Sequence, residues 1–298
     1  MIPQNPGYLS RPGLSRKAAR QRLDVLSVFQ CLFLPWLFFC AIFALLSCSL
    51  HFYRPTLTYI LVALGGLLLA GLCWTSLRLV KSLQEPSWYT FLFATMVVAW
   101  LLGVTFGNMN FAATTSPYHS YLNMDVLPEV SVEKSTGEEV MPAGRAFFGT
   151  NSLLDIRRSM AFKNVDTYCV APISIARGVI QPLENYDFWA IGLNCCSLNT
   201  ADFHCGEYQN PHAHSGLRLL NDEQRSFYRL AVEQAEAAYS IKAEHPLFFY
   251  WTEDATAEMD SFQQNGYKYF LIGMLGHFAF QTVCVLVAIA AFSNWDFA

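Results

Sequence analysis

The chain contains 298 residues, of which 53% are hydrophobic, 15% aromatic and 14% charged, and its mean hydropathy is +0.27. Soluble domains carry about 25% charged residues and disordered chains are poor in aromatic ones, so the composition argues against a purely soluble protein and against extensive disorder. The 19 basic and 23 acidic residues give no electrostatic support for binding nucleic acid, and we expect no nucleic-acid partner.

Three apolar stretches follow a basic N-terminal tail. The tail carries five basic residues, and no charged residue occurs between Asp24 and Arg54. A helix needs about 20 mainly apolar residues to cross a bilayer. The first stretch exceeds the apolar core of about 7–15 residues in a cleaved signal peptide, so we expect a retained anchor. The sequence predicts three spanning helices, over residues 26–50, 56–79 and 88–106.

The next segment, residues 107–266, is long enough to bury a core of its own. Its opening, from Asn108 to Ala143, mixes polar residues with prolines and predicts irregular structure. Asp166–Ser174 and Tyr186–Leu193 are short runs of aromatic and β-branched residues bounded by turn residues, which is typical of strands. The segment is therefore predicted to be a folded domain rather than a linker.

A helix is predicted from Asn221 to Ala243, because Asn221 followed by Gln224 resembles a capping box and apolar residues recur at helical spacing. Two apolar stripes are visible. The first contains Phe227, Leu230, Ala231, Ala238 and Ile241, and the second contains Tyr228, Val232, Ala235 and Tyr239. We expect the second stripe to pack inside the same domain rather than against a partner. The aromatic run Leu247–Trp251 that follows is interpreted as an anchor at the membrane interface.

A last apolar stretch, residues 267–292, predicts a fourth spanning helix. The predicted fold class is therefore a membrane protein, with a bundle of four transmembrane helices and a large α+β extracytoplasmic domain between helices three and four. The boundaries are residues 1–24 for a cytosolic basic tail, 25–106 for three helices, 107–266 for the domain, 267–292 for the fourth helix and 293–298 for a cytosolic tail.

Charges beside the apolar stretches predict the orientation, because basic residues of short loops remain in the cytosol. The tail and the loop with Arg78 and Lys81 are basic, whereas residues 107–266 hold 20 acidic and 10 basic residues. We expect an integral, multi-pass protein of the plasma membrane or an endomembrane, with both termini in the cytosol. Its expected partners are the lipid bilayer and other membrane proteins.

Four of the nine cysteines lie in the predicted domain, namely Cys169, Cys195, Cys196 and Cys205. Four cysteines in an extracytoplasmic domain predict two disulfides, for which three connectivities exist. Adjacent cysteines rarely bond each other. We therefore expect Cys195 and Cys196 to pair separately with Cys169 and Cys205, and either of the two remaining connectivities is compatible with the sequence.

A metal site is the alternative interpretation of this region. His204, His212 and His214 lie close in sequence to the cysteine pair, and zinc takes thiolate and imidazole ligands. Their spacing matches none of the usual paired Cys or His patterns, and an oxidising compartment would convert the thiols to disulfides. We expect no cofactor and keep zinc as the less favoured alternative.

Few polar side chains occur inside the predicted membrane helices. Gln30, His277 and Gln281 are the candidates for contacts there, and His277 and Gln281 share one helix face. Transporters and pumps keep conspicuous intramembrane charges, which these stretches lack. We expect one interhelical hydrogen bond, with Gln30 within reach across the bundle, rather than a proton relay.

The arrangement resembles tetraspanins. It shares with them four spans, cytosolic termini, a very short first outer loop and a large second one that contains a vicinal cysteine pair. The family's Cys-Cys-Gly motif appears here as Cys195-Cys196-Ser197, and no acidic residue occurs in the third or fourth predicted span. The resemblance covers the topology of the whole chain and implies the same four-span architecture.

Motifs of common enzyme classes are absent from the sequence, including G-x-S-x-G, H-E-x-x-H, the Walker loop and C-x-x-C. We therefore predict a non-catalytic scaffold or partner-binding protein that acts through its large extracytoplasmic loop. One alternative is an accessory subunit of a larger membrane complex. A second is a metal-dependent membrane enzyme that uses the Cys/His cluster.

Overall fold

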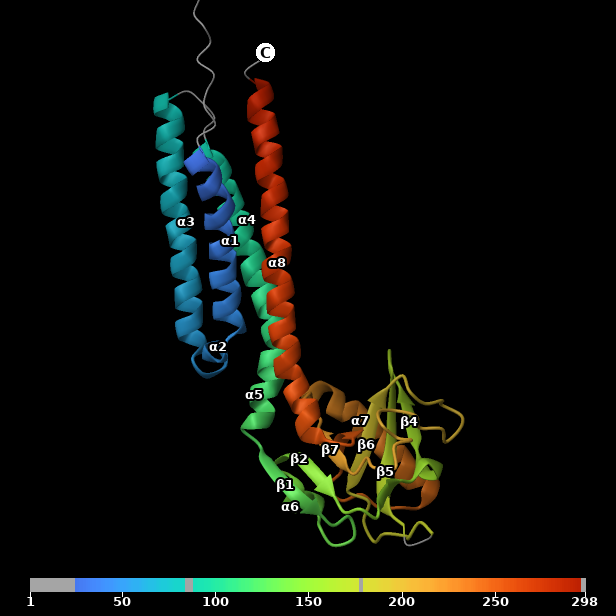
Figure 1. Ribbon diagram of the computed structural model, residues 1–298. Helices are drawn as coiled ribbons and strands as arrows, with labels where there is room; N and C mark the ends of the chain where they lie inside the picture. The colour runs from blue at the N-terminus through green and yellow to red at the C-terminus, as the bar shows by residue number, and fades with distance from the viewer. Residues whose placement is uncertain (1–24, 84–87, 177–178, 296–298) are drawn as a thin grey trace, which may run out of the picture.

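The structure, a computed structural model, describes residues 25–83, 88–176 and 179–295. It consists of a helical bundle with a sheet domain at one end of the bundle (Figure 1). Four helical segments are long and apolar enough to cross a membrane: Leu26–Ser47, Pro55–Arg78, Trp88–Leu122 and Ala255–Ala291. The predicted number of such helices is confirmed, and so is the position of the domain between the third and the fourth. The predicted tail, residues 1–24, lies outside the described residues.

Two of these helices extend far beyond their predicted boundaries. The bundle contains α1 (Val25–Ser47), α2 (Ser49–Tyr53), α3 (Pro55–Leu83), α4 (Trp88–Asn110), a π-helical turn (Phe111–Thr115), α5 (Ser116–Leu122) and α8 (Ala255–Trp295). The third span therefore continues as helix to Leu122, where irregular structure was predicted, and the last helix begins at Ala255. Hydropathy marks the end of the apolar stretch, whereas a helix continues as long as its backbone hydrogen bonds do.

Glycines allow α4 and α8 to lie close to α1. A Cβ atom at Gly107 of α4 would lie 2.7 Å from the Cβ of Leu46, and one at Gly273 of α8 would overlap the ring of Phe43. Helices in lipid associate mainly through such close backbone packing. α1 consequently packs against both α4 and α8, while α3 lies on the side of the bundle away from α8 (Figure 1).

The domain is built on a mixed eight-stranded sheet with the order β1-β2-β7-β8-β6-β5-β3, in which β4 also pairs with β5. The strands are β1 (Asp125–Val130), β2 (Ala143–Phe148), β3 (Ser152–Leu154), β4 (Met160–Lys163), β5 (Thr167–Ile175), β6 (Phe188–Leu193), β7 (Ser215–Arg218) and β8 (Leu247–Thr252). The pairs β1–β2 and β6–β8 are parallel, and the others are antiparallel. The two strands predicted from sequence are confirmed as β5 and β6.

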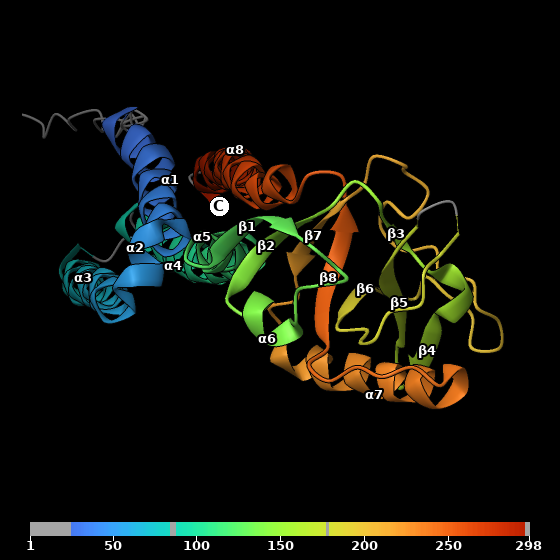
Figure 2. The same ribbon diagram turned by 90° about the horizontal axis from the view of Figure 1, so that it is seen from below.

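One face of the sheet is covered by α7 (Asp222–Tyr239), as Figure 2 shows. Tyr228, Val232 and Ala235 of this helix are buried against Trp189 and other strand residues. The helix begins where expected, because Asn221 accepts the backbone N–H groups of residues 223 and 224. The second apolar stripe thus packs inside the domain, as predicted, while Leu230 of the first stripe is exposed.

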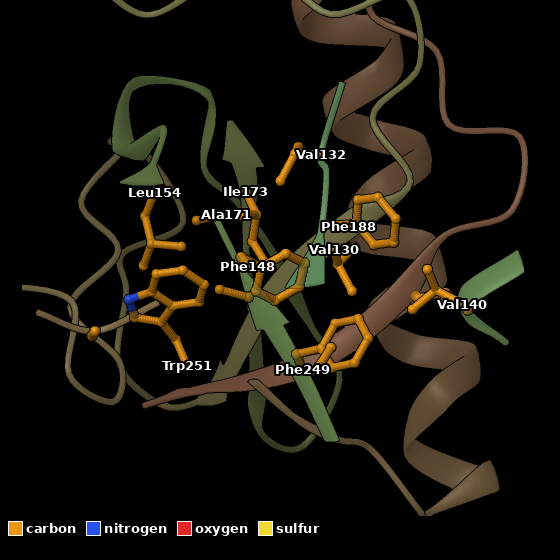
Figure 3. Close-up of a cluster of buried hydrophobic side chains, with 14 of the residues drawn as sticks. Val130, Val132, Val140, Phe148, Leu154, Ala171, Ile173, Phe188, Phe249 and Trp251 are labelled. Atoms are coloured by element: carbon orange, nitrogen blue, oxygen red, sulfur yellow. The ribbon is translucent and has the colours of Figure 1, made fainter. Parts of the chain in front are cut away.

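The other face carries an aromatic core beneath loops. Strands β2, β6 and β8 contribute its aromatic side chains, namely Phe148, Phe188, Phe249 and Trp251 (Figure 3). The cover is formed by Val140 of the short helix α6 (Gly137–Val140) and by the loop residues Val132, Phe203, Cys205 and Ala213. Because both faces of the sheet are covered, β8 is apolar or aromatic from Leu247 to Trp251 rather than alternating, and only Tyr250 of the strand is exposed.

The run Leu247–Trp251 is therefore not an interfacial anchor, and that interpretation is wrong. These residues form β8, which lies in the middle of the sheet between β7 and β6. Leu247, Phe248, Phe249 and Trp251 are all buried. An aromatic run beside an apolar helix looks alike whether it meets lipid or protein, so its pattern alone does not separate the two.

The domain and the bundle are joined by a buried contact. Tyr121 of α5, Leu217 of β7, and Ala255 and Met259 of α8 form a small apolar cluster at this joint. The hydroxyl of Ser215 donates to the main-chain oxygen of residue 252 at 3.0 Å and accepts the N–H of Ala255 at 2.8 Å. The first turn of α8 is thus fixed directly to the ends of the central strands β7 and β8.

Candidate functional site

The four cysteines of the domain form two disulfides. Cys169 of β5 bonds Cys196, and Cys195 bonds Cys205, with Cα–Cα distances of 5.9 and 5.2 Å. Each of the adjacent cysteines takes a different partner, as expected, and the structure gives the connectivity that the sequence left open. The Cys169–Cys196 bond fastens the long segment between β6 and β7 to the sheet, and the Cys195–Cys205 bond closes a loop within that segment.

Both disulfides lie over the same part of the sheet. Gly192 of β6 is paired with Cys169 of β5, and a Cβ atom at Gly192 would overlap both Cys195 and Cys205. Only glycine fits under the Cys195–Cys205 bond. The segment leaves the cysteine pair through Ser197, which donates from its N–H and its hydroxyl to Asp202 at 2.6 and 2.5 Å. These hydrogen bonds lower the pKa of the Asp202 carboxyl.

The histidines of the zinc alternative lie apart from the cysteine sulfurs. Among the described residues, the only group of three or more clustered potential metal ligands is Cys169, Cys195 and Cys205, whose sulfurs belong to the disulfides. His204 and His212 are exposed, and Nδ1 of His204 lies 2.7 Å from the main-chain oxygen of residue 202. A disulfide sulfur lacks the negative charge with which a thiolate binds zinc.

The fastened segment forms one wall of a cavity of about 380 Å³, which we call the loop pocket. Its floor contains the ring of Trp251 from β8. Its lining residues are Thr150, Asn151, Ser152, Leu153, Leu154, Ala176, Tyr208, Gln209, Asn210, Pro211, Ala213, His214 and Trp251. None of them carries a carboxylate, an ammonium or a guanidinium group, so the pocket offers amide and hydroxyl groups beside aromatic surface.

His214 and Ser152 contact each other in this pocket, and they resemble a base beside a nucleophile. Nδ1 of His214 lies 3.1 Å from the main-chain oxygen of Ser152 and 3.5 Å from its hydroxyl. A carbonyl only accepts, so Nδ1 carries the hydrogen and is not available as a base. The Ser152 hydroxyl donates instead to the oxygen of Gly149 at 2.6 Å. The pair therefore shapes the pocket instead of forming a nucleophile and its base.

The polar residues of the helical bundle form one interhelical hydrogen bond, as expected, but its acceptor is a main-chain oxygen instead of the Gln30 side chain. Gln281 of α8 donates to the main-chain oxygen of Cys31 at 2.6 Å. The Gln30 side chain is exposed instead of facing α8, so the expected contact with Gln30 is not formed. His277 stacks on Phe39 with 4.2 Å between ring centroids, and both its ring nitrogens are buried without a partner in the described part of the chain.

Sequence reasoning found the cysteines of the site but missed the remainder of the pocket. Asn151, Ser152 and Trp251 come from elements that are far from the cysteines in the chain, and no motif marks them. Comparisons with protein-family models, with curated proteins and with solved structures find no match for this chain. The resemblance to tetraspanins therefore stays a prediction from topology.

Proposed function

We propose that this chain is a non-catalytic, multi-pass membrane protein that binds an uncharged polar segment of a membrane partner in the loop pocket. The neutral lining of that pocket is the observation that carries the proposal. Amide and hydroxyl groups recognise a peptide through hydrogen bonds, and aromatic rings such as Trp251 and Tyr208 supply contact area at low entropic cost.

The size and rigidity of the pocket support this function. A volume of about 380 Å³ accommodates a few side chains of a partner. Its walls are held in place by the Cys195–Cys205 bond and by the His214 contact with Ser152. A pocket that is ordered before binding loses less entropy when a partner is bound.

The joint between bundle and domain fits the same function. α8 runs from Ala255 beside the sheet to Trp295 as one helix, so the domain is connected to the bundle without a flexible linker on that side. We infer that the loop pocket is held in a constant orientation to the bilayer. A partner embedded in the same membrane would then meet the pocket with a restricted set of orientations, which favours its binding.

We further infer that the domain is extracytoplasmic, with both termini in the cytosol. The two disulfides of the domain support this orientation, and so do the basic residues of the N-terminal tail and of the short loop with Arg78 and Lys81. Alkylation of thiols in sealed membranes tests it. We expect Cys169, Cys195, Cys196 and Cys205 to be labelled only after reduction, and free labelling without a reductant would contradict an oxidising compartment.

Site-specific photo-crosslinking in native membranes tests the binding function. A photoreactive amino acid replaces Gln209, which lines the loop pocket, or Gln234, an equally exposed glutamine of α7 on the opposite face of the sheet. We expect a discrete crosslinked partner from position 209 and none from position 234. The same product from both positions, or none from either, would argue against the loop pocket as the binding site.

The stoichiometry of that product separates the two non-catalytic roles. An accessory subunit remains bound to its partner at a fixed ratio after purification in a mild detergent. A scaffold is recovered with variable amounts of partner, because its contacts are weaker and exchange.

A further inference from the structure

A second cavity of the domain is basic. It has a volume of about 220 Å³ and lies between the end of β7, the first turns of α7 and the segment before β8. Figure 2 shows this region where α6 (Gly137–Val140) and the start of β8 approach α7. Arg218, Arg225 and Arg229 line it, together with one acidic residue, Glu244. We call it the arginine pocket.

Arg218 is the unusual member of this group. Its exposed fraction is only 9%, and one of its terminal nitrogens donates to the main-chain oxygen of Met141 at 2.9 Å. Within the described residues, no carboxylate lies within ion-pair distance of its guanidinium. The charged group that acts on it most is another cation, Arg225, and burial together with this repulsion lowers the pKa of Arg218. The fold therefore buries a positive charge without an internal counter-ion.

The other two arginines of the pocket form ion pairs with carboxylates along α7. Arg225 pairs with Asp222 at 2.9 Å, and Arg229 pairs with Glu233 at 3.5 Å. Both pairs are well exposed and are weakened by solvent screening. Glu244 pairs with Lys242 on the outer surface. Among the described residues, Arg218 is thus the one charged side chain of the lining without an ion-pair partner.

We propose that the arginine pocket binds a phosphate group, carried by a small phosphorylated molecule or by a lipid headgroup. A phosphate group would supply the negative charge that Arg218 lacks, beside two further arginines whose own pairs are exposed and weak. The planar guanidinium of Arg218 presents paired N–H donors in the geometry that phosphate oxygens accept. The cavity is large enough for one such group but not for an extended substrate. This site is independent of the loop pocket, which lies on the other face of the sheet.

Thermal unfolding of the full chain in detergent, titrated with sodium phosphate against sodium chloride at equal ionic strength, tests the site. We expect a saturable rise in the unfolding temperature with phosphate only. Arg218→Gln should weaken the apparent affinity at least about tenfold, because a charge-assisted bidentate contact is lost. Arg157→Gln, at an exposed arginine elsewhere in the domain, should leave it unchanged.

A second variant keeps the test valid if Arg218→Gln does not fold. Arg225→Gln changes an exposed side chain at the pocket entrance and should also weaken the phosphate effect. Nanodiscs of phosphatidylcholine with and without phosphatidic acid distinguish the two sources of the phosphate group. If phosphatidic acid stabilises the protein and free phosphate competes with this effect, the ligand is assigned as a lipid headgroup. The proposal would be overturned if phosphate and chloride had equal effects in detergent and phosphatidic acid had none. It would also be overturned if phosphate binding were unchanged in the Arg218 and Arg225 variants.

Discussion

Gln281 of α8 donates a hydrogen bond of 2.6 Å to the main-chain oxygen of Cys31 in α1. In a regular helix this oxygen would accept the N–H of residue 35, but residue 35 is a proline and has no N–H. Gln281 is fully buried, and its amide replaces the missing donor. The N–H that the proline of one helix lacks is therefore replaced by a polar side chain of another.

We expect Gln281→Leu to reduce the free energy of unfolding by about 1–2 kcal/mol, because the Cys31 oxygen then has no donor inside the bundle. In a Pro35→Ala background the same substitution should have much less effect, since an alanine at position 35 restores the N–H. Equilibrium unfolding of the four proteins of this double-mutant cycle in a mild detergent measures the coupling. An equal loss of stability in both backgrounds would contradict our assignment.

The coarse fold could be predicted from sequence because apolar length and alternation are local signals. The four apolar helices and the strands around Cys169 and Trp189 follow from such patterns. The helical extension to Leu122 and the buried strand Leu247–Thr252 could not, because both depend on what packs beside them. Leu217 and Met259, which meet Tyr121 at the joint, come from distant parts of the chain.

The candidate site divides in the same way. Adjacent Cys195 and Cys196 restrict each other's partners, so the pairing could be narrowed from sequence to two connectivities. The choice between them depends on Cys169 lying opposite Gly192, which is a property of strand register. No sequence pattern marks the arginine pocket. Arg218 lies in a short strand like many other arginines, and its lack of a counter-ion depends on which residues surround it in three dimensions.

Gly192→Ala should destabilise the domain by about 2–4 kcal/mol, because its Cβ atom would displace the Cys195–Cys205 bond. Mass spectrometry after alkylation without a reductant should then detect free thiols at Cys195 and Cys205, while the other disulfide stays closed. The matched control is Gly149→Ala, where a Cβ atom meets nothing within 4 Å. Closed disulfides and unchanged stability in the Gly192 variant would show that the loop moves freely over the sheet.

Asp254→Ala should reduce stability by about 1 kcal/mol, since the carboxylate of Asp254 accepts the N–H groups of Thr256 and Ala257 at 2.8 and 3.2 Å at the start of α8. Asp254→Asn should retain most of the stability, because asparagine caps helices equally well. Chemical unfolding followed by circular dichroism measures both. Glu129→Ala, at an exposed acidic residue of β1, is the control.

Tyr228→Phe should stabilise the domain by about 1 kcal/mol, because the Tyr228 hydroxyl is buried with no hydrogen-bond partner in the described part of the chain. Tyr121→Phe should instead destabilise the domain, since the Tyr121 hydroxyl donates to the main-chain oxygen of Arg218 at 2.6 Å.

Burial also raises the pKa of Tyr228 above its ordinary value of 10.0. The unfolded chain then loses that proton first, so wild-type stability should fall as the pH rises above about 10, and less steeply in the phenylalanine variant. Thermal unfolding between pH 7 and pH 11 measures both effects, and a destabilised Tyr228→Phe protein would mean that the hydroxyl is paired.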